Sequence, residues 1–321
     1  MKISIFDKPT QDYPMMALAF LLIGVSTLAL QDSLVKLMAS ETSFWQFQTI
    51  RSSFNMMFVL IIAFLSTGFR ILIPQRPVVV FLRSIMMTLC MLFFFGGVAH
   101  VSTAQMGAGL YTYPLFVTVL AGPILREKVG PFRLGALALG VLGSLLVLKP
   151  FGDNFHLVQI MPIIAGFFYA CNILILRKYC RHESPLTLAF IIALVFFTFG
   201  LLGMTVIDNL SLTEDIILSA PFIAIGWPKL TLIILGFCFF ASFLNLLGNI
   251  CMSRAYQTAE SSWLAPLDFS YLLFLTIWGK ILFDDLPSQS AALGMVMIAL
   301  AGMITAFRES YNRKKPSFVK L

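Results

Sequence analysis

The sequence contains few charged residues: Asp, Glu, Lys and Arg make up 12% of its 321 residues, against about 25% in an ordinary soluble domain. It has three histidines, none adjacent, and five cysteines without the spacing of a metal site. It also lacks the H-E-x-x-H, G-x-S-x-G and P-loop patterns. These absences exclude ATP-driven pumping within this chain. They also argue against an enzyme, and they indicate no cofactor and no resident metal.

Apolar residues are abundant instead, at 59% of the chain with 32 phenylalanines. They form runs of about 20 residues, the length that a helix needs to cross the hydrocarbon core of a bilayer. Membrane-spanning segments in such a chain must be helices, because lipid cannot satisfy free backbone groups. The sequence therefore predicts an all-α membrane protein with ten transmembrane helices, at residues 14–38, 44–66, 78–99, 103–125, 131–149, 156–177, 186–207, 230–253, 258–282 and 287–307.

One connection, residues 208–229, is long enough to hold structure of its own. Ser211 and Glu214 have the spacing of a capping box ahead of an apolar run that Pro221 interrupts. That run is too short to span, so it predicts a helix lying on the membrane surface.

Basic residues in the loops set the orientation. With the N-terminus inside, sixteen of the 22 Lys and Arg fall on the inner side and four on the outer side. Both termini are therefore expected in the cytoplasm of a bacterial inner-membrane protein. Because the basic residues are spread over many short loops, the net charge of +7 indicates topology and not nucleic-acid binding.

The chain also repeats itself. The segment STAQMGAGLYTYPLF in the fourth predicted span parallels QTAESSWLAPLDFSYLLF in the ninth, and Gly135/Gly143 parallel Gly294/Gly302 in the fifth and tenth. An odd number of spans per half predicts two inverted five-helix repeats, residues 14–149 and 156–307, followed by a basic cytoplasmic tail, 308–321. Secondary transporters with inverted repeats bind their substrate near the midplane, between the halves. The glycines are expected to let helices pack closely.

These repeated segments resemble the EamA-type repeats of the drug/metabolite transporter superfamily, and the resemblance covers roughly residues 14–308. The branch with Asp-x3-Lys in span 1, an Arg in span 2 and Pro-x-Asp in span 9 includes S-adenosylmethionine and riboflavin carriers. The resemblance implies a carrier of small metabolites in the bacterial inner membrane. Lys280 and Asp284–Asp285 depart from the usual family pattern at the outer rim.

Ionisable residues inside spans are functional candidates, because they are costly to insert. Asp32 and Arg51 are each nine or ten residues from the turn near Glu41, which places both roughly 14 Å below it. We expect them to pair across a helical hairpin. Two alternatives stay open: the pair only locks two helices, or it forms one wall of a binding site. Lys36 and Arg83 lie nearer to helix ends and are expected to snorkel to the surface.

Asp268 lies about ten residues into the ninth span, close to mid-bilayer, with no basic residue of that span at comparable depth. Pro266 frees a backbone carbonyl beside it, and Trp263 and Tyr271 could bracket a planar or cationic ligand. Asp268 is either a substrate-binding residue or a structural hydrogen-bonding group. Its protonation would couple transport to a proton gradient, a point that the sequence leaves open.

Four further residues complete the predicted substrate site. Asn245 and Asn249 follow Ser242 on one face of span 8, where such residues either join helices or line a cavity. Tyr113 occupies the region of span 4 that matches Pro266–Asp268, and Tyr169 comes from span 6.

These observations favour a secondary transporter that moves a small polar metabolite, similar to S-adenosylmethionine, riboflavin or an amino acid, by alternating access. The expected partners are that small molecule and the lipid bilayer, and the protein is expected to be a monomer or a homodimer. A membrane-embedded enzyme and a non-transporting receptor or scaffold are the alternatives.

Overall fold

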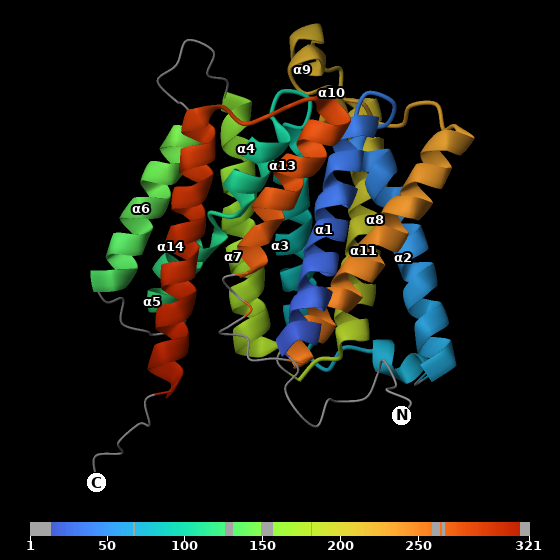
Figure 1. Ribbon diagram of the computed structural model, residues 1–321. Helices are drawn as coiled ribbons and strands as arrows, with labels where there is room; N and C mark the ends of the chain where they lie inside the picture. The colour runs from blue at the N-terminus through green and yellow to red at the C-terminus, as the bar shows by residue number, and fades with distance from the viewer. Residues whose placement is uncertain are drawn as a thin grey trace.

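The computed structural model describes residues 14–66, 68–125, 131–148, 157–180, 182–258, 264 and 267–314. Within these ranges all regular structure is helical, and the long helices stand side by side as one bundle (Figure 1). Six helices in the described ranges are long and apolar enough to cross a membrane. The prediction of an all-α membrane protein is confirmed at that level.

The first half of the chain supplies α1 (Pro14–Met38), α2 (Phe44–Ser66), the 3-10 turn η1 (Phe69–Leu72), α3 (Pro77–Gly96), α4 (Thr103–Leu110), α5 (Tyr113–Leu125) and α6 (Pro131–Leu148). The second half supplies η2 (Leu157–Ile160), α7 (Met161–Tyr179), α8 (Pro185–Asn209), α9 (Glu214–Ser219), α10 (Pro221–Ala224), α11 (Leu232–Thr258), η3 (Leu267–Phe269), α13 (Ser270–Phe283) and α14 (Gln289–Lys314).

Local chemistry explains where several helices begin. Proline occupies the first turn of α3, α7 and α8, where its missing N–H costs nothing. Ser102 caps α4 in a complete capping box with Gln105. The bounds of α1 and α2 agree with the predicted spans, whereas α14 continues past residue 307 to Lys314 because Arg, Glu and Lys are good helix formers.

The long connection after α8 folds differently from the prediction. Helix α9 begins after Thr213, and no side chain caps it, so the expected capping box between Ser211 and Glu214 does not form. A second short helix, α10, starts at Pro221, the residue expected to interrupt the run. Phe222 of α10 is buried and packs edge-on against Phe44 of α2. This part of the connection therefore docks on protein.

Packing follows pairs of helices that are distant in sequence. Helix α1 packs along α11 and α13, α2 along α8, α3 along α7, and α6 along α14. The α6–α14 pair lies at one edge of the bundle (Figure 1). Helix α11 packs against both α1 and α2, whereas α1 and α2 themselves share at most a marginal contact.

Glycines allow two close helix crossings. A Cβ added to Gly143 of α6 would lie 2.7 Å from the carbonyl oxygen of Gly294 in α14, and a Cβ on Gly294 would collide with the carbonyl of Gly143. Gly24 and Gly248 face each other in the same way between α1 and α11. Gly135, in contrast, has nothing within 4 Å of an added Cβ. The expected glycine packing therefore holds at Gly143 but not at Gly135.

Candidate functional site

The predicted fourth span is broken in the middle. Helix α4 ends at Leu110 and α5 begins at Tyr113, followed directly by Pro114. Proline has no N–H to donate, and the Thr112 hydroxyl donates to the Gly109 carbonyl across the break. In the other half, α13 is preceded by the 3-10 turn η3, which contains Asp268. Irregular backbone of this kind is tolerated at membrane depth only where protein or water surrounds it.

A chain of side-chain hydrogen bonds connects three helices beside these breaks. The Tyr271 hydroxyl of α13 donates to Asp32 Oδ2 of α1 at 2.5 Å. Gln31 Nε2 donates to Asp32 Oδ1 at 2.9 Å, and Asn245 Nδ2 of α11 donates to Gln31 Oε1 at 2.9 Å. The Asp32 carboxyl group thus has a donor on each oxygen, from two different helices.

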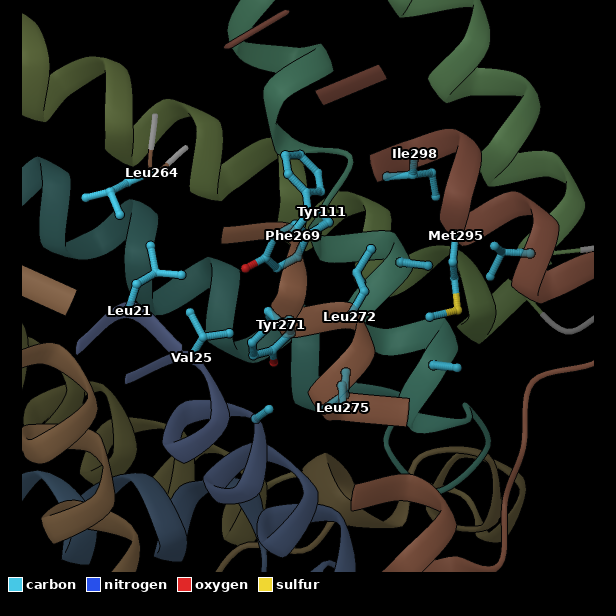
Figure 2. Close-up of a cluster of buried hydrophobic side chains, with 14 of the residues drawn as sticks. Leu21, Val25, Tyr111, Leu264, Phe269, Tyr271, Leu272, Leu275, Met295 and Ile298 are labelled. Atoms are coloured by element: carbon cyan, nitrogen blue, oxygen red, sulfur yellow. The ribbon is translucent and has the colours of Figure 1, made fainter. Parts of the chain in front are cut away.

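An aromatic group continues from Tyr271 into the first half of the chain. The Tyr111 and Tyr271 rings stack with centroids 5.1 Å apart and planes at 14°. The Tyr111 hydroxyl donates to the backbone carbonyl of Asp268 at 3.1 Å, and Phe269 packs edge-on against Tyr111. Figure 2 shows these three rings inside an apolar cluster that includes Leu272 and Leu275 of α13. That cluster fixes the rings and excludes water from around them.

Two further predicted residues lie at the edge of this aromatic group. Tyr113 is 5.8 Å from Tyr111 between ring centroids, and Tyr169 of α7 meets Tyr113 edge-on at 4.9 Å. Asp268 is close enough to Tyr111 and Tyr169 for its charge to act on both. Among the described residues, no side chain donates a hydrogen bond to the Asp268 carboxyl group.

Arg51 has a different environment from the predicted one. Its side chain is 2% exposed, donates through Nη2 to Gln48 at 2.9 Å, and lies over the Phe47 and Phe196 rings at 5.0 and 5.7 Å. No ion pair within 4.0 Å joins it to Asp32, although their charges still interact through space. The expected direct pair is therefore wrong, because α11 packs between α1 and α2.

Of the other predicted site residues, some belong to this central group and some do not. Asn245 joins the hydrogen-bonded chain, but Asn249 is exposed and donates back to the Asn245 carbonyl of its own helix. Trp263 and Pro266 lie outside the described residues. Gln31 and Tyr111 belong to the group, although the sequence did not single them out as site residues. Their positions beside Asp32 and in the motif YTYP that matches the region of Asp268 were the available signals.

The arrangement offers surfaces for reversible binding of a small molecule. The described residues contain no cluster of His, Cys, Asp and Glu that could hold a metal ion. What they offer is flat aromatic surface, phenolic hydroxyls and two carboxyl groups, which can hold a planar or polar small molecule through stacking and hydrogen bonds.

Comparison with known proteins points in the same direction. Residues 15–149 match the EamA-like transporter family, which confirms the resemblance noted in the sequence. A protein named riboflavin transporter from Vibrio cholerae is 31% identical over 206 residues, which are 64% of this chain and 62% of the relative. A protein named S-adenosylmethionine uptake transporter from Rickettsia bellii is 24% identical over 243 residues, 75% of this chain and 76% of the relative.

A solved crystal structure is similar in fold. It covers 91% of this chain and 99% of its own, with a TM-score of 0.56 and 13% sequence identity. At that identity the similarity concerns the fold alone.

Proposed function

We propose that the protein is a secondary transporter that carries a small polar metabolite across a membrane, since residues 15–149 match the EamA-like transporter family. The observation that supports this proposal most directly is the group formed by Asp32, Tyr111, Asp268 and Tyr271. It lies beside the break between α4 and α5 in the first half of the chain and beside the 3-10 turn that leads into α13 in the second half. Interrupted helices around a polar group at depth are typical of transporter substrate sites.

The halves, in this proposal, are inverted repeats that enclose the site. The helix pairs support it, because they are related by exchange of the two halves. The contact of α1 with α11 corresponds to that of α7 with α3, and the contact of α1 with α13 corresponds to that of α7 with α4 and α5. In the pairs α2–α8 and α6–α14, each helix packs against its own counterpart in the other half, so exchange of the halves leaves these pairs unchanged. An inverted arrangement allows the same contacts to close the site on either side in turn.

The chemistry of the site suggests its cargo. Four tyrosines present flat surface, and the Asp32 and Asp268 carboxyl groups accept hydrogen bonds or attract positive charge. A planar ring with N–H or O–H groups fits this set, as does a zwitterion with a cationic centre. Riboflavin is the first compound to test, followed by S-adenosylmethionine and aromatic amino acids.

Transport, in this proposal, requires the site to open. The stacked Tyr111 and Tyr271 rings and the Tyr271–Asp32 hydrogen bond occupy the space between α1, α4 and α13. A ligand must replace at least one of these contacts, which gives it different affinities for the closed and open states. Protonation of Asp268 during the cycle would couple transport to a proton gradient.

Uptake into proteoliposomes tests this function. We expect the wild-type protein to accumulate at least one of the three compounds. We expect Asp268→Asn to abolish that uptake with little change in melting temperature, because the substitution removes the charge without opening a void. Trp263→Ala, which removes an aromatic side chain predicted to stack on the ligand, is measured beside it as the control for stacking. If Asp268→Asn takes up the compound at the wild-type rate, Asp268 is not part of the substrate site. If the wild-type protein accumulates none of the three compounds, the receptor and enzyme alternatives remain.

Orientation forms a separate part of the proposal. The distribution of basic residues over the loops supports an orientation with both termini in the cytoplasm of a bacterial inner membrane. Reporter fusions after Lys320 and at residues 67–77 should give cytoplasmic signals, and a fusion within residues 208–229 should give an external one. A cytoplasmic signal from this last position would refute the orientation.

A further inference from the structure

Arg83 has an unusual position in α3. It lies six residues after Pro77, about 9 Å along the helix from its first turn. The sequence predicted that its long side chain would snorkel to the surface. The structure contradicts this prediction, because Arg83 is only 9% exposed.

Two of the three nitrogens of the buried guanidinium group lack a hydrogen-bond partner among the described residues. Its Nε and Nη1 atoms are both inaccessible to water and make no hydrogen bond. No ion pair within 4.0 Å joins Arg83 to a carboxylate among the described residues. Glu183 is already engaged, because its two oxygens accept the backbone N–H groups of Gln75 and Arg76 at the start of α3. A buried charge without compensation is strongly unfavourable, so an acceptor at this position would be held tightly.

The surroundings connect Arg83 to the central group. Helix α3 packs along α7, and the titratable groups that interact with the Arg83 charge are Cys180 and Tyr169. Tyr169 is the ring that meets Tyr113 at 4.9 Å. One turn further along α7, Asn172 is buried and its Oδ1 atom has no donor. Unpartnered donors on α3 and an unpartnered acceptor on α7 therefore lie next to the proposed substrate site.

We propose that Arg83 is the core of an anion-binding subsite on the α2–α3 loop side of the tyrosines, and that it takes the carboxylate or phosphate group of a soluble molecule. The inference rests on the proposed function in one respect: the molecule is the transported compound, held by its ring at the tyrosines and by its anionic group at Arg83. A hydroxyl or amide N–H beside the anionic group would satisfy Asn172. Such a cargo is an organic anion or a zwitterion.

Inorganic phosphate is a suitable probe, because it can be tested without knowledge of the cargo. In detergent solution, the melting temperature of the wild-type protein should rise as phosphate replaces chloride at constant ionic strength. Arg83→Gln should lose this rise. Arg70→Gln, which removes an exposed arginine of the α2–α3 loop, is the matched control and should keep it. An equal rise in Arg83→Gln and in the wild-type protein would overturn the proposal.

A second variant covers the case in which Arg83→Gln does not fold. Arg83→Lys keeps the charge but loses the planar pair of donors. The phosphate concentration that gives half of the rise in melting temperature should therefore increase at least about fivefold. An unchanged midpoint would overturn the proposal. In nanodiscs, stabilisation by an anionic lipid in place of phosphate would also overturn it, because a lipid headgroup would then be the ligand.

The proposed function is tested separately by uptake of riboflavin, S-adenosylmethionine and aromatic amino acids, of which riboflavin is neutral. A phosphate response that depends on Arg83, in a protein that transports nothing, would retain the subsite and reject the transporter. The reverse result, riboflavin uptake with no phosphate response, would reject the subsite alone.

Discussion

The hydrogen bond between Tyr271 and Asp32 permits a sharp test of how the centre of the bundle is held together. Tyr271→Phe removes one hydroxyl and leaves the ring, so the stack with Tyr111 at 5.1 Å is retained. Asp32 loses one of its two donors and keeps Gln31. A net hydrogen bond to a charged group contributes about 1.5–3 kcal/mol in soluble proteins, whereas side-chain hydrogen bonds within membranes average about 0.6 kcal/mol. We expect a loss of about 1–2 kcal/mol in unfolding free energy.

A double-mutant cycle isolates this interaction from other effects of the substitutions. Tyr271→Phe, Asp32→Asn and the double variant are unfolded by heat and denaturant in the same detergent, with Tyr179→Phe as a control, since Tyr179 is exposed. The two sites should show a coupling energy of about 0.5–2 kcal/mol, and Tyr179→Phe should be neutral. Strictly additive losses would show that the hydroxyl and the carboxyl group do not interact, and the described closed site would be wrong.

Two other predictions concern contacts outside the central group. Gly294→Ala places a Cβ against the carbonyl of Gly143 and should lower the unfolding free energy by about 1–3 kcal/mol through overpacking. Gly135→Ala adds its Cβ in open space and should be neutral or slightly stabilising. Equal melting temperatures of the two variants would refute the close α6–α14 crossing. Glu183→Gln weakens the acceptor for the backbone N–H groups of Gln75 and Arg76, just before α3, and should lower stability by about 1 kcal/mol. Exposed Glu41→Gln is the control, and limited proteolysis of residues 68–76 should accelerate only in Glu183→Gln.

Hydropathy and proline positions were sufficient to predict most helices, because both act locally along the chain. The bounds of α1 and α2 follow directly from them. The break at Tyr111–Thr112 was not predicted, because the surrounding residues are as apolar as a continuous helix requires. The hydrogen bond from the Tyr111 hydroxyl to the Asp268 carbonyl is a tertiary contact at this break, and such a contact has no local sequence signal.

The Asp32–Arg51 prediction failed for a geometric reason. Counting 1.5 Å per residue gives the depth of a side chain, but not the direction in which its helix faces. We expected two helices joined by a short turn to pack together, yet α11 contacts both of them instead. The Ser242 hydroxyl of α11 donates to the Arg51 carbonyl, and Asn245 of the same helix donates to Gln31. Only the three-dimensional arrangement of helices distant in sequence could reveal this.

The hydrogen bond from Tyr111 to the Asp268 carbonyl has a consequence for the order in which the protein is assembled. The Asp268 carbonyl, in the second half of the chain, accepts this hydrogen bond from a side chain of the first half. During synthesis the first half enters the membrane before its partner exists, so the Tyr111 hydroxyl has no such acceptor until α13 is inserted. Until then the first half of the chain lacks this contact and is less tightly packed. Membrane chaperones and quality-control proteases would recognise it at this stage. A chain terminated after residue 157 should accordingly be degraded in cells far faster than the full-length protein.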